Sequence, residues 1–230
     1  MFRRKPNAKG QVDKMKRKIS LYLAICSLFA FVLWTLLVRF INVQAIGPQG
    51  SKVGFASVNG FFYALIGVNM RLYVITDWLG LVPVFIALGF AILGLIQWIK
   101  RKNILKVDYS ILALGVFYIV VFSAYILFEY VVINYRPVLI NGYLEASYPS
   151  STTLLVTCVM PTAIIELRRR IKNNALKQGV TFTMIAFILF MVVGRFISGV
   201  HWFSDIVGGL LLSAGLVLGY DYATRLHGAK

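Results

Sequence analysis

Residues 181–222 read TFTMIAFILFMVVGRFISGVHWFSDIVGGLLLSAGLVLGYDY, two apolar runs separated by the polar stretch GRFISGVHWFSD at 194–205. Each apolar run is close to the roughly 20 residues that cross a bilayer as a helix. Arg195, His201 and Asp205 therefore stand where one predicted span ends and the next begins. Ionisable groups are costly at membrane depth, so they usually mark a functional site.

The composition of the whole chain indicates an integral membrane protein. The mean hydropathy is +0.79, and charged residues make up 14% of the chain, against about a quarter in soluble domains. We therefore predict an all-α fold, a six-span transmembrane helix bundle. The six apolar stretches that have the length of a membrane helix are 20–41, 76–99, 109–133, 151–167, 181–199 and 204–222.

The first apolar run is interpreted as a retained span. Its basic start resembles a signal peptide, but the run from Ser20 to Val38 is too long for a signal core and no small-residue cleavage pattern follows. The predicted organisation is a basic segment at 1–19, a membrane domain at 20–222 and a tail at 223–230.

The basic residues predict the orientation of the bundle. If the N-terminus is cytoplasmic, 19 of the 24 lysines and arginines lie on the cytoplasmic side, in agreement with the positive-inside rule. Both termini are then cytoplasmic. Because the net charge of +16 is explained by loops between spans, nucleic acid is not expected as a partner, and the basic loops are expected to contact membrane lipids.

The long outer segment 42–75 leaves two alternatives. Its apolar residues could form an amphipathic helix at the membrane interface, or the segment could be a loop packed over the bundle. Glycines near the C-terminus, Gly208, Gly209 and Gly215, predict close helix packing. Cys26 and Cys158 lie inside apolar runs, and both are interpreted as small buried side chains.

Two arginines and a helix start predict an anion site on the outer side. Arg136 and Arg195 are fixed cations whose forked donors suit phosphate oxygens. Ser150 or Ser151 can cap the fourth span, whose first N–H groups are free to bind an anion.

A histidine and an aspartate on the same side predict chemistry at that anion. His201 can act as a nucleophile or proton carrier near neutral pH. Asp205 follows four residues later, so on a helix it would share a face with His201 and could hold its ring N–H. Together with the cations, these groups favour transfer of a phosphoryl group.

These stretches resemble the signature of the type 2 phosphatidic acid phosphatase family of membrane lipid phosphatases, KxxxxxxRP, PSGH and SRxxxxxHxxxD. The third part corresponds to GRFISGVHWFSD, the second to PSST at 149–152, and the first to Glu129 followed by Arg136 and Pro137. The resemblance covers about 75–222, and the six-span order agrees with it.

The resemblance implies roles for single residues. His201 would be the nucleophile that forms a phosphohistidine, and Asp205 would orient it. The phosphate-binding residues would be Arg136, Ser150, Ser151, Thr152 and Arg195. The family needs no metal and no organic cofactor.

Two positions depart from the family pattern. Thr152 replaces the histidine that protonates the leaving group, and Glu129 replaces a phosphate-binding lysine. Glu145 lies on the correct side and is the best substitute acid, with a solvated loop carboxylate as the plainer alternative. Glu129 is expected to make a structural pair inside the bundle. Gly194, in place of serine, still offers an amide to the phosphate.

The predicted function is a lipid phosphatase in the plasma membrane of a bacterium. Without the histidine acid, a diphosphate is favoured as substrate, because its leaving group ends in a phosphate with a pKa of roughly 6. A polyprenyl diphosphate is the example we favour. The alternative is a catalytically impaired member that binds a phospholipid headgroup or transfers phosphate to another acceptor. A transporter is less favoured, because the polar residues cluster at one end of the spans.

Overall fold

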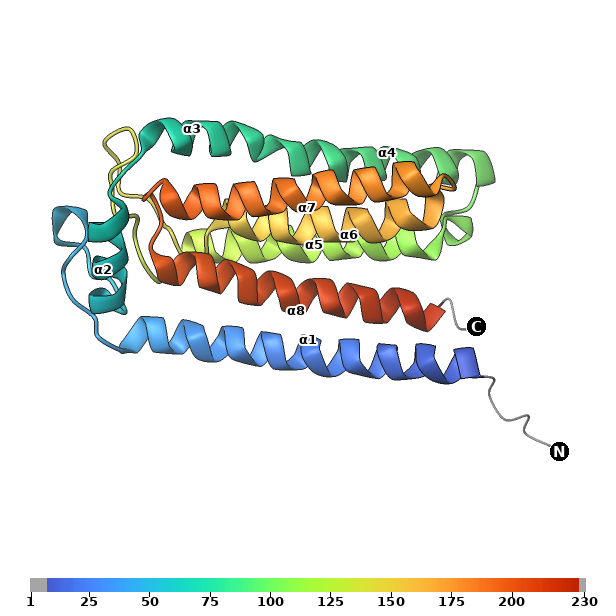
Figure 1. Cartoon of the computed structure of the whole chain (residues 1–230), viewed down its shortest axis with the longest axis horizontal. Coiled ribbons are helices and arrows are strands. Elements are labelled where there is room, and N and C mark those ends of the chain that lie inside the picture. The colour runs from blue at the N-terminus through green and yellow to red at the C-terminus, as the bar shows by residue number, and fades with distance from the viewer. Residues whose placement is uncertain (1–7, 228–230) are drawn as a thin grey trace.

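The computed structural model describes residues 8–227, and its regular elements in this range are helices, without a β-strand (Figure 1). This confirms the predicted all-α fold. Isolated β-bridges, such as Tyr135 with Ala146, shape the loops. The elements are α1 (Ala8–Phe40), η1 (Pro48–Gly50), α2 (Ala56–Ile66), α3 (Met70–Leu79), α4 (Leu81–Arg101), η2 (Ile104–Lys106), α5 (Tyr109–Tyr130), α6 (Ser151–Arg170), α7 (Asn174–Ile197) and α8 (Phe203–His227).

Six helical segments are long and apolar enough to cross a membrane, as predicted, so the chain is a multi-pass membrane protein. Five are the single helices α1, α5, α6, α7 and α8. The sixth joins α3 to α4 and runs over Met70–Arg101, 32 residues. It begins six residues before the predicted second span, and its early part reaches the site described below.

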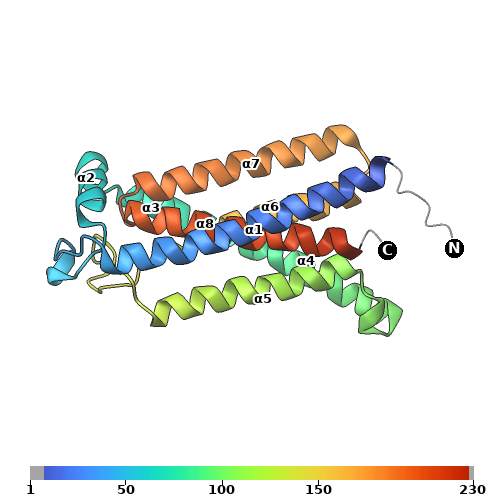
Figure 2. The ribbon, with the colours of Figure 1, turned by 90° about the horizontal axis from the view of Figure 1, so that it is seen from below.

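The helices α6 and α8 lie at the centre of the bundle. More than half of the α6 span, 56%, is buried inside the protein, whereas only 17% of the α1 span is. Helix α6 contacts α4, α5, α7 and α8, and α1 packs along α8 (Figures 1 and 2). The hydroxyls of Thr157 and Thr162 donate to carbonyls one turn earlier in α6, which lets polar side chains enter the bundle without unsatisfied donors.

The glycines of α8 allow its neighbours to approach, as predicted. A Cβ atom on Gly208 would lie 2.6 Å from the Tyr148 ring, and a Cβ atom on Gly215 would lie 2.7 Å from the Leu28 side chain in α1. Cys158 is buried, but Cys26 is exposed, so the expectation for Cys26 was wrong. Because α1 contacts few other helices, most of its surface faces outward.

Helix α1 begins and α8 ends at the same end of the bundle, which we call the basic end (Figure 1). A buried carboxylate, Glu166, ties the helices together there. It accepts hydrogen bonds from Ser110 of α5 and Tyr220 of α8, and it forms ion pairs of 2.8 Å with Arg169 and Arg170. A fully buried acid is tolerated because every lone-pair direction finds a donor.

The opposite end, which we call the site end, carries the loop 131–150 and helix α2, which lies across the bundle (Figure 2). Phe62 of α2 stacks on Phe203 at 4.5 Å between ring centroids, while Phe61 and Leu65 are exposed. Both alternatives for 42–75 are therefore partly right, because α2 packs over the bundle with one face and leaves an apolar face outside.

Candidate active site

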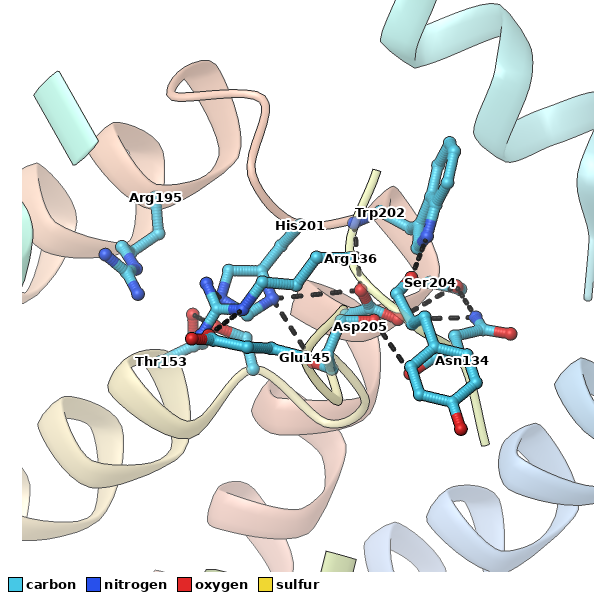
Figure 3. A network of polar contacts seen from close by, with 12 residues as sticks. Asn134, Arg136, Glu145, Thr153, Arg195, His201, Trp202, Ser204 and Asp205 are labelled. Carbon is cyan, nitrogen blue, oxygen red and sulfur yellow. Dashed lines mark hydrogen bonds and ion pairs between the residues drawn. The ribbon is translucent and has the colours of Figure 1, made fainter. Parts of the chain in front are cut away.

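The two arginines, Ser151, Thr152 and Glu145 meet at a cavity of about 630 Å³ at the site end. They come from three elements: Arg136 and Glu145 from the loop 131–150, Arg195 from α7, and the other two from the start of α6. His201 and Asp205 are buried next to the cavity wall, at the junction of α7 and α8 (Figure 3).

The contacts of His201 indicate which ring nitrogen carries the proton. Nδ1 lies 3.2 Å from the carbonyl oxygen of Ser147. A carbonyl only accepts, so Nδ1 carries the proton and Nε2 keeps its lone pair. Nε2 faces Nη1 of Arg136 at 3.5 Å. Burial, together with the charges of Arg136 and Arg195, holds the pKa of His201 well below its ordinary value, so the ring is neutral near pH 7.

Asp205 lies beside His201, but its shortest hydrogen bond is with the backbone of Trp202. The distance from His201 Nδ1 to Asp205 Oδ2 is 3.8 Å, longer than the bond to Ser147. Asp205 accepts a 2.9 Å hydrogen bond from the N–H of Trp202, the residue before α8. It is thus the third residue of α8 reaching back to cap the helix start, and the imidazole packs next to a carboxylate that the cap holds in place.

The turn that presents His201 depends on Gly199. Its φ is +68°, and a Cβ atom there would lie 1.9 Å from the carbonyl oxygen of Gly67. The same contact region is fixed by the N–H of Asn69, which donates to the carbonyl of Ser198. Only glycine combines this conformation with such a close approach, so the loop before α3 positions the histidine loop.

Both arginines are buried, and each is paired with a carboxylate. Arg195 is 1% exposed, lies 3.5 Å from Asp77 and sits over the Tyr73 ring at 4.9 Å. Nε of Arg136 lies 3.1 Å from Oε2 of Glu145, an ion pair without the alignment of a hydrogen bond. Tyr73 lies under both guanidinium groups, because Arg136 is also 5.9 Å from its ring centroid. The two cations therefore pack against the same aromatic ring.

The start of α6 differs in detail from the prediction. Ser150 precedes the helix, but its side chain makes no capping bond. Its hydroxyl instead accepts from Thr153, and its N–H donates to the carbonyl of Asp205. Ser150 is fully buried, whereas Ser151 and Thr152 line the cavity. The N–H groups that could bind the predicted anion are therefore those after Ser150.

Glu129 was expected to pair inside the bundle, but it is exposed and lines the cavity. No lysine or arginine lies within ion-pair distance of it in the described range 8–227. Glu145 is not simply a solvated carboxylate, because it pairs with Arg136. Within this range no group of three or more His, Cys, Asp or Glu side chains could hold a metal ion.

Several site residues were not foreseen from the sequence. Tyr73 and Asp77 belong to α3, which begins before the predicted second span. Asp77 carried a usable signal, an acid at the edge of an apolar run. The carbonyl of Ser147 carried none, because any residue offers that acceptor. Asn134 donates to Asp205 at 3.4 Å and accepts from the N–H of Gly54, so it joins the loop 131–150 to the start of α8 and to the loop before α2.

The comparison with known families agrees with the motifs. Residues 116–226 match the PAP2 superfamily. The match contains all three motif stretches and confirms the resemblance noted in the sequence. A similar fold is found in the crystal structure of a transmembrane PAP2-type phosphatidylglycerolphosphate phosphatase from Bacillus subtilis, with a TM-score of 0.61 and 18% identity over 91% of this chain and 98% of that chain. No curated protein matches the chain.

Proposed function

We propose that this protein is a membrane lipid phosphatase that acts through a phosphohistidine formed on Nε2 of His201. The observation that carries the proposal is the state of this ring. Its Nδ1–H is held by Ser147, and its Nε2 lone pair points to Arg136 beside the polar cavity. An unprotonated ring nitrogen next to cations favours attack on a phosphate, once a phosphate oxygen takes the Arg136 donor from Nε2.

The proposed reaction has two displacements. Nε2 attacks phosphorus, the bond from phosphorus to the lipid oxygen breaks, and the lipid leaves with a proton. Arg136, Arg195 and the first N–H groups of α6 offset the charge on the phosphate oxygens. Asp205 and the Ser147 carbonyl stabilise the positive ring that results. A water molecule then attacks the phosphohistidine, releases phosphate and restores the neutral histidine.

The substrate we favour is a lipid diphosphate, such as a polyprenyl diphosphate in the plasma membrane of a bacterium. Thr152 lines the cavity at the position where the related motif has its acid, and a threonine hydroxyl is a poor proton donor. A diphosphate depends less on that donor, because the phosphate that leaves has a pKa of roughly 6. Glu145, once displaced from Arg136, is the proposed source of the remaining proton.

A second candidate function is headgroup binding without hydrolysis, or transfer of the phosphoryl group to another acceptor. The observation that favours it is the pairing of each arginine with a carboxylate, at 3.1 Å for Arg136 and 3.5 Å for Arg195. A phosphate must displace these carboxylates before it reaches Nε2. A site with this barrier and without the histidine acid is suited to slow turnover.

The test is phosphate release by detergent-purified protein from a polyprenyl diphosphate, phosphatidic acid and phosphatidylglycerol phosphate. We expect release from the diphosphate to be fastest and to vanish in His201→Ala. A ³²P label on the terminal phosphate should remain on the wild-type chain after acid-free quenching. Equal or faster turnover of phosphatidic acid contradicts the substrate preference, and release that survives in His201→Ala contradicts the mechanism.

A further inference from the structure

We propose that a groove between α4 and α5 binds an anionic phospholipid of the leaflet at the basic end. One acyl chain would lie in the groove, and the phosphate would lie beside Lys102 and Lys106. The groove has a volume of about 400 Å³ and shares no lining residue with the cavity of the candidate active site. The inference is therefore independent of the proposed function.

The groove has the position and the length of one leaflet. Trp98, Ile104 and Val107 line it next to the connection 102–108, which lies at the same end of the bundle as the start of α1 and the end of α8 (Figure 1). Along α4 the lining continues from Trp98 to Ala87, which is about 16 Å of helix. A hydrocarbon core of about 30 Å gives each leaflet a depth of about 15 Å. An acyl chain that reaches from the headgroups to the bilayer midplane therefore fits the groove.

Small residues on the two helices form the groove. Ala87, Ala91 and Gly94 line it from α4, and Gly115 lines it from α5. A Cβ atom on Gly94 would lie 3.0 Å from the Ile111 side chain, so the two helices approach closely there. A Cβ atom on Gly115 would meet no atom within 4 Å, so the groove is open at this position.

The groove is apolar and faces the membrane. Leu95 and Val116, which line it, are 49% and 63% exposed. The hydroxyl of Tyr118, another lining residue, lies 3.3 Å from that of Thr162 in α6 and is therefore satisfied within the protein. An acyl chain fills such a groove through dispersion contacts, but these contacts do not distinguish one phospholipid headgroup from another.

The charges beside the groove select an anionic headgroup. Lys102 and Lys106 are exposed, and among the described side chains no carboxylate lies within ion-pair distance of either lysine. Asp108, the acid that ends the connection between α4 and α5, instead pairs with Arg101 and Arg170. Basic residues next to a pocket between transmembrane helices on the cytoplasmic side are typical of binding sites for anionic lipid headgroups.

A second copy of this chain is a weaker candidate for the groove. In the membrane it would have the same orientation as the first copy, so its own lysines would lie at the same level. The two sets of like charges would then repel each other. A lipid with a net negative charge instead gains from both lysines.

The experiment is native mass spectrometry of the full-length protein in detergent, titrated with phosphatidylglycerol and phosphatidylcholine that have the same acyl chains. We expect the wild type to bind the first phosphatidylglycerol about 25-fold more tightly, which is about fivefold for each lysine. The double variant Lys102→Gln and Lys106→Gln should reduce this preference to about twofold or less. The matched control is Lys16→Gln with Lys18→Gln, which removes two exposed lysines of α1 at the same end and should keep the preference.

A second variant tests the groove itself. Gly115→Leu fills the groove and should weaken the binding of phosphatidylglycerol about tenfold, because the acyl chain loses several buried CH₂ groups. Gly89→Leu is the matched control, because a Cβ atom on Gly89 of α4 also meets no atom within 4 Å and this glycine does not line the groove. Its affinity should equal that of the wild type.

Several outcomes overturn the proposal. These are equal binding of the two lipids by the wild type, unchanged affinity for phosphatidylglycerol in Gly115→Leu, and equal loss of the preference in the two double lysine variants. The same spectra report dimers, and a dimer whose share falls in Gly115→Leu would show that a second copy covers the groove instead.

The candidate active site is tested separately, because it also binds phosphate in the proposed function. Arg136→Gln, a change at the site end, should leave the binding of the first phosphatidylglycerol unchanged. A loss of this binding in Arg136→Gln overturns the assignment to the groove. Absence of phosphate release from every lipid would refute the proposed function and leave the lipid site, since the binding experiment needs no turnover.

Discussion

At the scale of single residues, the main departure from the family motif is Thr152, which stands where the motif has the histidine that acts as the general acid. Thr152 lines the cavity together with Ser151 and both arginines. A histidine at this position can donate a proton to an alkoxide leaving group, and general acid catalysis typically contributes about 10²–10⁴-fold.

We therefore predict that Thr152→His raises phosphate release from phosphatidic acid by about tenfold or more, the low end of that range because the surroundings are not adapted. Release from a polyprenyl diphosphate should change less, since its leaving group needs less assistance. Thr152→Asn is the matched control, similar in polarity but unable to act as an acid. A variant that folds and shows the same phosphatidic acid rate as Thr152→Asn would refute the assignment of this position.

His201 gives a prediction for the pH dependence of stability. Its pKa in the folded protein lies well below the ordinary value of 6.5, whereas in the unfolded chain it returns to that value. Below pH 6.5 the unfolded state therefore binds a proton that the folded state does not. The free energy of unfolding should fall by up to about 1.4 kcal/mol per pH unit from this group as the pH drops below 6.5.

The measurement is the detergent-phase melting temperature between pH 7.5 and pH 5. His201→Asn should lose part of the decline, because asparagine does not titrate. Because the pKa of His201 in the folded protein lies well below 6.5, the rate of phosphohistidine formation should not fall with a midpoint near pH 6.5. If the melting temperatures of the wild type and of His201→Asn depend on pH in the same way, His201 has the same pKa in the folded and the unfolded protein, and the prediction is wrong.

At the scale of helices, α8 is held by its glycines. The Cβ of an alanine at Gly208 would lie 2.6–2.8 Å from the Tyr148 ring. The ring cannot easily move, because it is 1% exposed, stacks with Phe31 and bonds Thr35 through its hydroxyl at 2.7 Å. Gly219 has the opposite surroundings, with no atom within 4 Å of such a Cβ.

The same substitution at these two glycines should therefore have opposite effects. Gly208→Ala should destabilise the protein by about 1–3 kcal/mol through overpacking. Gly219→Ala should be neutral or stabilising by up to about 1 kcal/mol, because alanine favours helix. Melting temperatures of the two purified variants check the prediction. Equal shifts would mean that the contact between α8 and the loop 131–150 is not tight in solution.

The elements themselves were largely predictable, because apolar length alone locates spans. The hydropathy of the spans also indicated which of them is most buried. Of the six spans, α6 has the lowest hydropathy and the largest buried share, as expected when a polar helix must be covered by protein rather than lipid. No sequence pattern indicated the early start of α3, because Arg71 interrupts the apolar pattern. Because the start of α3 was not predicted, the position of Tyr73 next to the two arginines was not predicted either.

The candidate site was predictable where side chains carry the chemistry. Arg195, His201 and Asp205 have a spacing that a helix junction converts into proximity, and the structure brings them to one end. The acceptor for Nδ1 of His201 is a backbone carbonyl, which no residue type encodes. The pairing of Arg136 with Glu145 depends on the fold of the loop 131–150, where the N–H of Arg136 donates to the carbonyl of Glu145.

At the scale of the whole molecule, the two ends differ in charge and in chemistry. The basic end contains the Glu166 cluster with Arg169 and Arg170, and the site end contains the cavity. The positive-inside rule predicts that the basic end lies in the cytoplasm and the site end outside. A lipid phosphate in the outer leaflet would lie at the level of the cavity, so orientation decides which pool of lipid the protein can use.

Labelling with a membrane-impermeant maleimide tests this orientation. Tyr143, 74% exposed in the loop 131–150, and Lys172, exposed between α6 and α7, are suited to replacement by cysteine. Cys26 and Cys158 lie within predicted spans, so the unmodified chain should remain unlabelled and serve as the control. We expect Tyr143→Cys to react in intact cells and Lys172→Cys to react only after the membrane is opened. The reverse pattern would place the cavity in the cytoplasm and restrict the protein to inner-leaflet lipids.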